Sequence, residues 1–428
     1  MKLYLKTTET RIISVDSEDM HDSNMTIDVK DIDEFYSKTK DYDSLDDEIE
    51  EQVKEFLENS NGERSLKTFN IKHWVSNRSF GELIDMYENG EIEKPDMQRE
   101  FIWDSLKCSR LIESIILGLP IPPLFLLEVK SSQYELIDGF QRLSTLVNYV
   151  NEYPWSGRSG DTGKRKVKSR LSSKVSSEIA GKTFGDLDSE HQRIIKRSTI
   201  PLIEFKQLEP DNLSSKYLIF ERINTGSEKL NQMQIRKSLA HGTFMQDLYE
   251  NANKCALYKS LFSPQNIKKD QHIEAYLRTI VMSKIYYEDF KVEREGINNI
   301  LNDYCEKHRN EKISKDFGEK FEFAIRHIHD IFKNSKCMFR RVEKDLQGKY
   351  IYTGNLNVSI LEALVGVCIN ISPFNHNIDE IEERYKNIMH KTLEESLRKR
   401  AENPFSISTG SYSAITGRFS ICEDIMGK

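Results

Sequence analysis

The sequence predicts an α+β protein in which strands and helices share the first half of the chain and helices alone form the second. Three observations support this prediction. Apolar runs typical of strands lie at residues 66–74, 124–129, 134–138 and 200–205. After about Phe244, apolar residues recur at helical spacing to the end of the sequence. The length of 428 residues is also sufficient for more than one domain with its own core.

Charge divides the chain further. Residues 1–60 contain 18 acidic and 7 basic residues, a net charge of −11, so the rest of this chain of net charge −7 carries +4. We predict an acidic N-terminal extension at 1–60, a strand-containing domain at 61–245 and a helical domain at 246–428. The extension is expected to be solvated and partly helical; alternatively, it mimics nucleic acid and covers a basic groove. The mildly basic remainder would meet nucleic acid without strong repulsion.

Cysteine usage and hydropathy indicate the compartment. The six cysteines lie far apart and form no C-x-x-C pair, which argues against a structural zinc site and against a disulfide framework. The first residues are too polar for a signal peptide, and no apolar run approaches membrane-spanning length. We therefore expect a cytoplasmic protein that contacts no membrane and holds no metal through its own side chains.

The strand-containing domain is expected to begin with the strand at 66–74 and a helix at 79–87. The next helix carries an apolar stripe over Leu111–Ile116 and ends at Gly118. A buried strand at 124–129 follows. It should form a hairpin with the strand at 134–138, because only a short polar turn separates the two runs.

The stretch 134–149, YELIDGFQRLSTLVNY, joins a strand to an amphipathic helix through a single glycine. This arrangement points the first N–H groups of the helix, those of Gln141 and Arg142, towards an anion such as a phosphate. The Arg142 guanidinium suits bidentate phosphate contact, and Asp138 could accept a proton or face a metal. The alternative is an ordinary Asp138-Gly139 turn followed by solvated residues of a first helical turn.

Two further motifs accompany this one. The first motif, residues 95–103, reads P-x-x-Q-R-x-F-x-W and precedes L-I-E-S-I-I-L-G-L-P-I-P. The second motif, residues 137–146, is part of the stretch above and reads I-D-G-F-Q-R-L-S-T-L. The third motif, residues 220–230, reads FERINTGSEKL. In this order the motifs resemble the N-terminal domain of the GmrSD-type modification-dependent restriction systems, a member of the ParB/sulfiredoxin-like superfamily. The resemblance covers about residues 66–251. It implies a small mixed sheet with flanking helices, here followed by the all-helical domain.

The resemblance also implies a site that binds a nucleoside triphosphate with Mg²⁺. Its catalytic residues would be Asp138, Gln141 and Arg142. Its nucleotide-binding residues would be Gln98, Arg99, Gly139, Arg222, Asn224 and Thr225. We expect the two Gln-Arg pairs to line one cleft together with Asp138.

Two positions depart from the family's pattern. Phe140 stands where the family usually has Gln, and it cannot donate a side-chain hydrogen bond to a nucleotide. Met233-Gln234 stands where the family usually has Gln-Glu. These departures bear on hydrolysis of the nucleotide more than on its binding.

Residues 152–177 form an irregular segment rich in Gly, Ser and basic residues. Its basic residues are close enough to act as one patch and are candidates for DNA binding: Lys164, Arg165, Lys166, Lys168 and Arg170. Trp155 is a candidate for base stacking. The alternative is a surface loop without a ligand.

The function that these features predict is a nucleotide-binding module of a prokaryotic anti-phage restriction system that also hydrolyses the nucleoside triphosphate. DNA would be its target, homo-oligomers are possible, and a partner nuclease or methyltransferase would act with it, because no HNH nuclease half is found. A first alternative is a non-catalytic sensor of nucleotide or modified DNA. A second is a nuclease of the PD-(D/E)xK type, from Pro95-Asp96 with Glu128 and Lys130.

Overall fold

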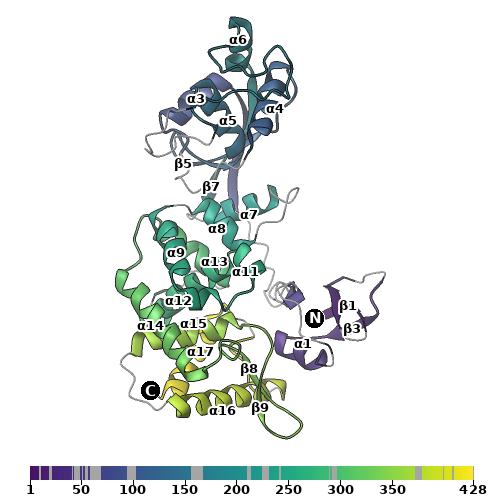
Figure 1. Cartoon of the computed structure of the whole chain (residues 1–428), viewed down its shortest axis with the longest axis vertical. Helices are drawn as coiled ribbons and strands as arrows, with labels where there is room; N and C mark the ends of the chain where they lie inside the picture. Colours follow the sequence, from purple (N-terminus) through teal and green to yellow (C-terminus); the bar gives the residue numbers. More distant parts are fainter. Residues whose placement is uncertain are drawn as a thin grey trace. The chain divides into compact units, whose positions relative to one another are not determined.

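The computed structural model describes residues 1–8, 11–18, 22–40, 42, 49–50, 52–53, 56–57, 69–93, 103–155, 167–209, 214–223, 231–240, 242–288, 290–291, 296–371, 378–398, 400–406 and 409–427. The chain divides into two compact units. The sheet unit comprises Lys67–Leu230 and Lys237–His241; the helical unit comprises Met1–Leu66, Asn231–Arg236 and Gly242–Lys428. Helices and strands occur in both, so the predicted α+β class is confirmed (Figure 1).

Within the described part of the sheet unit, four strands form one sheet in the order β4, β7, β5, β6. Their bounds are Asn70–Ser79 for β4, Leu124–Lys130 for β5, Gln133–Asp138 for β6 and Thr199–Glu209 for β7. β5 runs antiparallel to β6 and parallel to β7, and β4 runs antiparallel to β7, so the sheet is mixed. The predicted hairpin of β5 and β6 is confirmed, while β4 lies several residues later than the predicted strand.

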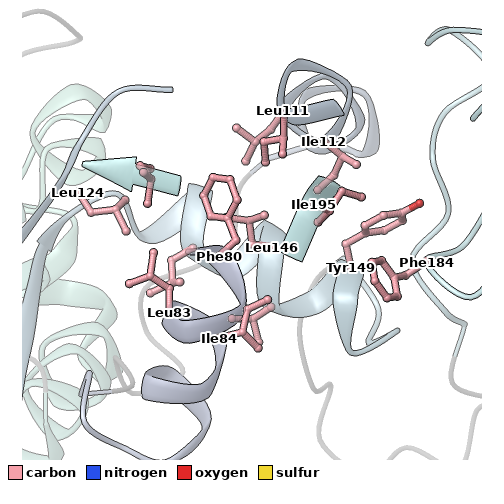
Figure 2. Close-up of a cluster of buried hydrophobic side chains, with 14 of the residues drawn as sticks. Phe80, Leu83, Ile84, Leu111, Ile112, Leu124, Leu146, Tyr149, Phe184 and Ile195 are labelled. Atoms are coloured by element: carbon pink, nitrogen blue, oxygen red, sulfur yellow. The ribbon is translucent and has the colours of Figure 1, made fainter. Parts of the chain in front are cut away.

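Helices α3 (Phe80–Glu88), α4 (Ser105–Ile116), α5 (Phe140–Val150) and α6 (Ser189–Arg197) share one apolar core with this sheet. Leu124, Leu136 and Leu202 contribute the core side chains of three neighbouring strands. Figure 2 shows Phe80, Leu146 and Ile195 gathered in this core, with the rings of Tyr149 and Phe184 at one end of the cluster. The core fixes α5, and therefore the residues at its start, against the end of β6.

The helix starts in this core differ in one respect. Ser79, Asp104 and Asp188 cap α3, α4 and α6, because each side chain accepts a hydrogen bond from a backbone N–H of its helix's first turn. Helix α5 instead begins at Gly139, which has no capping side chain. Among these four helices, α5 is therefore the one whose N-cap residue supplies no side-chain acceptor to the first turn.

The N-terminal segment is folded, which corrects the expectation of a solvated extension. In its described residues, β1 (Lys2–Thr7), β2 (Ile12–Asp16) and β3 (Met25–Asp28) form an antiparallel sheet, followed by α1 (Ile32–Lys38). Alternate strand residues such as Leu3 and Leu5 are buried with Phe35, while Asp28 at the end of β3 is exposed. The acidic composition masked this two-residue period.

A buried ion pair fastens this segment within the helical unit. Asp33 accepts a hydrogen bond from Nδ2 of Asn403 at 2.6 Å, and its other oxygen lies 2.6 Å from Nε of Arg341. The Arg341 guanidinium also stacks over the ring of Tyr36, 4.3 Å from its centroid. Residues near the two ends of the chain therefore share one polar cluster in this unit.

The rest of the helical unit is mainly helical. Its helices, with α7 and α8 that precede them, have these bounds: α7 Ser214–Ile223, α8 Gln232–Leu239, α9 Thr243–Lys254, α10 Ala256–Lys259, α11 Pro264–Lys268, α12 Gln271–Tyr287, α13 Ile297–Lys307, α14 Lys315–Phe332, α15 Val358–Ile371, α16 Ile378–Leu397 and α17 Tyr412–Met426. Glu362 of α15 is fully buried and pairs with Arg278 of α12 and Arg418 of α17. Among the described helices, none combines the length and apolarity needed to span a membrane.

A hairpin interrupts the helices, and the prediction of helices alone after about Phe244 is wrong here. β8 (Arg341–Lys344) pairs antiparallel with β9 (Tyr350–Thr353). The hydroxyl groups of Tyr350 and Tyr352 donate hydrogen bonds to Asn387 and Glu382 of α16, at 2.5 and 2.9 Å. Packing against α16 therefore stabilises two strands of only four residues each.

Candidate functional site

The site begins where β6 ends. Asp138 is the last residue of β6, and Gly139 turns the chain into α5 with φ of +104°. A Cβ atom at Gly139 would lie 2.1 Å from Cδ2 of Leu124, so a side chain is excluded both by the backbone conformation and by the neighbouring strand. The sequence predicted this turn, and the structure adds the reason why only glycine fits it.

Arg142 lies back over this turn. Its Nη2 donates hydrogen bonds to Oδ2 of Asp138 at 2.8 Å and to the carbonyl oxygen of Pro123 at 3.1 Å. The side chain is only 17% exposed, so the guanidinium joins the start of β5, the end of β6 and the first turn of α5. Among the described residues, the buried Nε of Arg142 has no hydrogen-bond partner. A buried N–H of this kind is costly unless an acceptor reaches it.

Gln141 connects this turn to the first motif. Its Oε1 accepts a hydrogen bond from the backbone N–H of Trp103 at 3.3 Å. One turn further along α5, the hydroxyl of Thr145 lies 3.6 Å from Sγ of Cys108 in α4. Burial raises the pKa of the Cys108 thiol to about 11, which favours the protonated thiol at neutral pH.

The residues that precede the first motif also lie beside β6. The N–H of Glu93 donates to the carbonyl of Tyr134 at 2.8 Å, and the N–H of Tyr134 donates to the carbonyl of Glu91 at 2.7 Å. The chain is therefore held beside the start of β6 by Glu91 and Glu93, and beside the first turn of α5 by Trp103. Gln98 and Arg99, which lie between these anchors in the sequence, fall outside the described residues. The convergence of the two Gln-Arg pairs stays a prediction.

The two departures from the family's pattern have structural explanations. Phe140 packs against the core of the sheet unit. Met233 is 1% exposed, and Gln234 forms a capping box with Asn231: the N–H of Asn231 donates to Oε1 of Gln234 at 3.1 Å, and the N–H of Gln234 donates to Oδ1 of Asn231 at 2.9 Å. Either Gln or Glu performs this capping role, so Gln234 is a weak argument against turnover.

The third motif is only partly described. Arg222 lies on the exposed surface of α7, near its end. Asn224 and Thr225 fall outside the described residues. The helix predicted at 214–223 is confirmed as α7, whereas the expected nucleotide contacts of its following turn stay a prediction.

The basic segment contributes two described candidates, and each is paired with an acid. Lys168 pairs with Glu152, and Arg170 donates to Asp186 at 3.2 Å and to the carbonyl of Gly181 at 3.0 Å. The Lys168 hydrogen bond is the largest cause that lowers the pKa of Glu152. These contacts tie Lys168 to the start of the segment and Arg170 to residues that follow it. Lys164, Arg165 and Lys166 lie outside the described residues.

One face of the Trp155 ring packs against another side chain of the protein. Its ring stacks on Tyr149 with centroids 5.6 Å apart and an interplanar angle of 6°, and its Nε1 donates to the carbonyl of Arg170 at 3.0 Å. The base-stacking role expected for Trp155 would have to use the opposite face. Its observed role is to fasten the basic segment to the end of α5.

The geometry gives little support to the nuclease alternative. Glu128 lies 3.4 Å from Lys206 of β7, and the pairing of β5 with β6 is irregular between Glu128 and Lys130. The simple alternation that would place both side chains on one face is therefore interrupted. Pro95 and Asp96 lie outside the described residues, and the described part of the chain contains no group of three or more His, Cys, Asp or Glu side chains able to hold a metal.

Two residue pairs near this turn escaped the sequence analysis. The Asp138–Arg142 pair could have been predicted from the sequence, because opposite charges four residues apart come together when the second residue lies on a helix. The other pair, Glu135 on β6 and Lys216 on α7, is buried and lies 3.3 Å apart. Its members are 81 residues apart in the sequence, so no local pattern could have indicated it.

Comparison with known proteins agrees with the motif order. Residues 80–241 match the sequence model of the family described as GmrSD restriction endonuclease, N-terminal domain. This match confirms the resemblance for a region that contains all three motifs, and it associates that region with restriction systems. No curated protein and no solved structure matches the chain.

Proposed function

We propose that this chain is a nucleoside triphosphate-dependent component of a prokaryotic restriction system that acts on foreign DNA. Residues 80–241, which match the GmrSD N-terminal domain, would bind the nucleotide. A partner nuclease or methyltransferase would act on the DNA, because no HNH nuclease half is found in the sequence. Lys164, Arg165 and Lys166 would contact the DNA backbone, while Lys168 and Arg170 keep their acidic partners.

The observation that carries this proposal is the Arg142 side chain at the start of α5. The first turn of a helix attracts anions through its N–H groups and the helix dipole. Here the N-cap residue Gly139 supplies no side-chain acceptor to that turn, and Arg142 adds a guanidinium whose buried Nε has no acceptor among the described residues. A phosphate oxygen would supply that acceptor. Asp138 would hold the guanidinium in place before the nucleotide arrives.

Hydrolysis needs a group that positions water. If the protein hydrolyses the nucleotide, Gln141 and Asp138, the polar residues beside Arg142, would orient the attacking water. A magnesium ion that arrives with a triphosphate needs only one or two protein carboxylates and keeps several waters, so Asp138 fits this donor set. The positive charge of the magnesium ion would help to neutralise the phosphates at the turn.

A sensor that binds nucleotide without turnover is the second candidate, and Phe140 favours it. This side chain packs against the core and offers no polar atom, at a position where the family usually has Gln. Binding would then change the state of a partner, and no product would form. The two candidates share the same site and differ only in whether the nucleotide is consumed.

We expect the purified full chain to bind at least one of ATP, GTP, CTP and UTP in the presence of Mg²⁺. Titration calorimetry measures binding, and release of inorganic phosphate measures turnover. Binding with phosphate release supports the hydrolase, and binding without it supports the sensor. No detectable binding for any of the four triphosphates would reject the proposed function in both forms.

A further inference from the structure

The β8–β9 hairpin of the helical unit ends in an ordered turn that presents one apolar side chain to solvent. Oδ1 of Asp345 accepts hydrogen bonds from the backbone N–H groups of Gln347 and Lys349, at 2.9 and 2.8 Å. The N–H of Asp345 donates to the carbonyl of Lys349 at 2.9 Å. Leu346 is 108% exposed, more than any other large apolar side chain that the structure describes. The turn is therefore held by its backbone and Asp345, and Leu346 adds no packing to it.

Two lysines flank this turn. Lys344 and Lys349 are exposed, and neither ammonium group forms an ion pair within the described part of the chain. The two acids of the hairpin are engaged inside it: Asp345 faces the N–H groups of the turn, and Glu343 accepts a hydrogen bond from the hydroxyl of Thr353 at 3.0 Å. The outer end of the hairpin therefore presents two positive charges on either side of one apolar side chain.

The base of the hairpin is braced against α16 (Figure 1). The ring of Tyr350 packs edge-on against His390 of α16 with centroids 5.5 Å apart, and its hydroxyl donates to Asn387 at 2.5 Å. Nζ of Lys344 lies over the same tyrosine ring, 4.9 Å from its centroid. A ribbon fixed in this way can press its tip into a partner without bending away.

We infer that the β8–β9 hairpin is a DNA-contacting wedge, in which Lys344 and Lys349 contact phosphates and Leu346 inserts between base pairs. A two-stranded ribbon fits a DNA groove, and apolar side chains such as Leu, accompanied by basic residues, unstack base steps in many complexes. A protein pocket could also accept Leu346, but two unpaired lysines beside it favour a polyanion. The inference goes beyond the proposed function, which assigns no DNA contact to the helical unit, and it does not depend on the nucleotide site.

The test measures binding of the full chain to a fluorescein-labelled DNA duplex of about 30 base pairs, by anisotropy at salt concentrations from about 50 mM upward. A second duplex carries 2-aminopurine in place of adenine along one strand, and its fluorescence rises when a base is unstacked. The parent should bind the first duplex and raise the fluorescence of the second. Circular dichroism follows the melting of the helical unit, because all three tryptophans, Trp74, Trp103 and Trp155, belong to the sheet unit.

The lysines are tested as a pair. Lys344→Ala with Lys349→Ala should weaken binding at least about fivefold at the lowest salt and reduce the slope of log affinity against log salt by about two. The control, Lys254→Ala with Lys320→Ala, removes two lysines that are each paired with an acid four residues away, and it should change neither quantity measurably. A Lys344 and Lys349 double variant that binds as the parent does would overturn the inference.

Leu346 is tested for the insertion. Leu346→Ala should abolish the rise in 2-aminopurine fluorescence at the parent's melting temperature and salt slope, whereas Leu346→Met should keep the rise. Ile13→Ala, which truncates a side chain that is 54% exposed on β2, should behave as the parent does. A parent that binds no duplex, or that binds without a rise in fluorescence, would overturn the wedge and leave Leu346 as a contact for a protein partner. A parent that binds no triphosphate would reject the proposed function without affecting this result.

Discussion

Replacing Arg142 with alanine is expected to weaken nucleoside triphosphate binding by about 2–3 kcal/mol, or roughly 30- to 150-fold. The guanidinium belongs to the first turn of α5, and its loss would remove a charge-assisted contact with a phosphate. The same change leaves Asp138 and the carbonyl of Pro123 without the bonds that Arg142 donates. We therefore also expect the sheet unit to lose about 1–2 kcal/mol of stability. Calorimetry measures the first effect, and tryptophan fluorescence during denaturation measures the second.

Two matched variants separate these effects. Arg142→Lys should keep the ion pair with Asp138 and recover only part of the affinity, since an ammonium cannot reproduce the planar fork. Arg326→Ala removes an arginine from an exposed pair with Glu322, also four residues apart, and should change neither quantity measurably. An Arg142→Ala protein with the parent's affinity would show that Arg142 only ties β5, β6 and α5 together.

Gly139→Ala is expected to destabilise the sheet unit by about 2–5 kcal/mol. Two costs add. An L-residue is strained at φ of +104°, and the new methyl group would lie 2.1 Å from Cδ2 of Leu124 and 3.2 Å from Nη2 of Arg142. To relieve the clash, β5 or α5 must shift, and the shift would also displace Arg142. Denaturation followed by tryptophan fluorescence measures the loss of stability.

Gly90→Ala is the control that measures the cost of backbone strain without a steric clash. Gly90 has φ of +79° at the end of α3, and a Cβ atom there would meet nothing within 4 Å. Its substitution should cost only about 1–2 kcal/mol, the strain of an L-residue in the left-handed region. Equal losses for the two variants would contradict the contact between Gly139 and Leu124 on which the tight turn depends.

The sequence predicted the local parts of this fold well. The hairpin of β5 and β6, the glycine turn and α5 follow from a change in apolar period from two to 3.6 residues within 134–150, and the structure has all three. The sequence also predicted helix α7 and strand β7. In each case the residues that decide the conformation are neighbours in the chain.

The missed features depend on distant partners. β8 and β9 are strands of only four residues each, so their alternating apolar pattern cannot be distinguished from the helical pattern of the sequence around them. Their position depends on contacts with α16. The N-terminal strands were missed because the acidic composition of residues 1–60 outweighed the alternating apolar residues of short strands such as β1. Lys216 reads as one more surface lysine of an amphipathic helix, and only the folded chain shows that it is buried against Glu135. Charge and composition describe a surface, and they cannot say which charged residue is turned inward.

The central claim, that the turn between β6 and α5 holds the phosphates of a nucleotide, is tested most directly by amide hydrogen exchange with and without the triphosphate that the chain binds. Exchange reports local opening of backbone hydrogen bonds and protection by a ligand. The account predicts that added nucleotide slows exchange in peptides that cover 138–143, and that Arg142→Ala abolishes this change. Peptides from α14, at 315–332, serve as the internal reference. Tight binding that leaves exchange over 138–143 unchanged, with protection only elsewhere, would contradict the account.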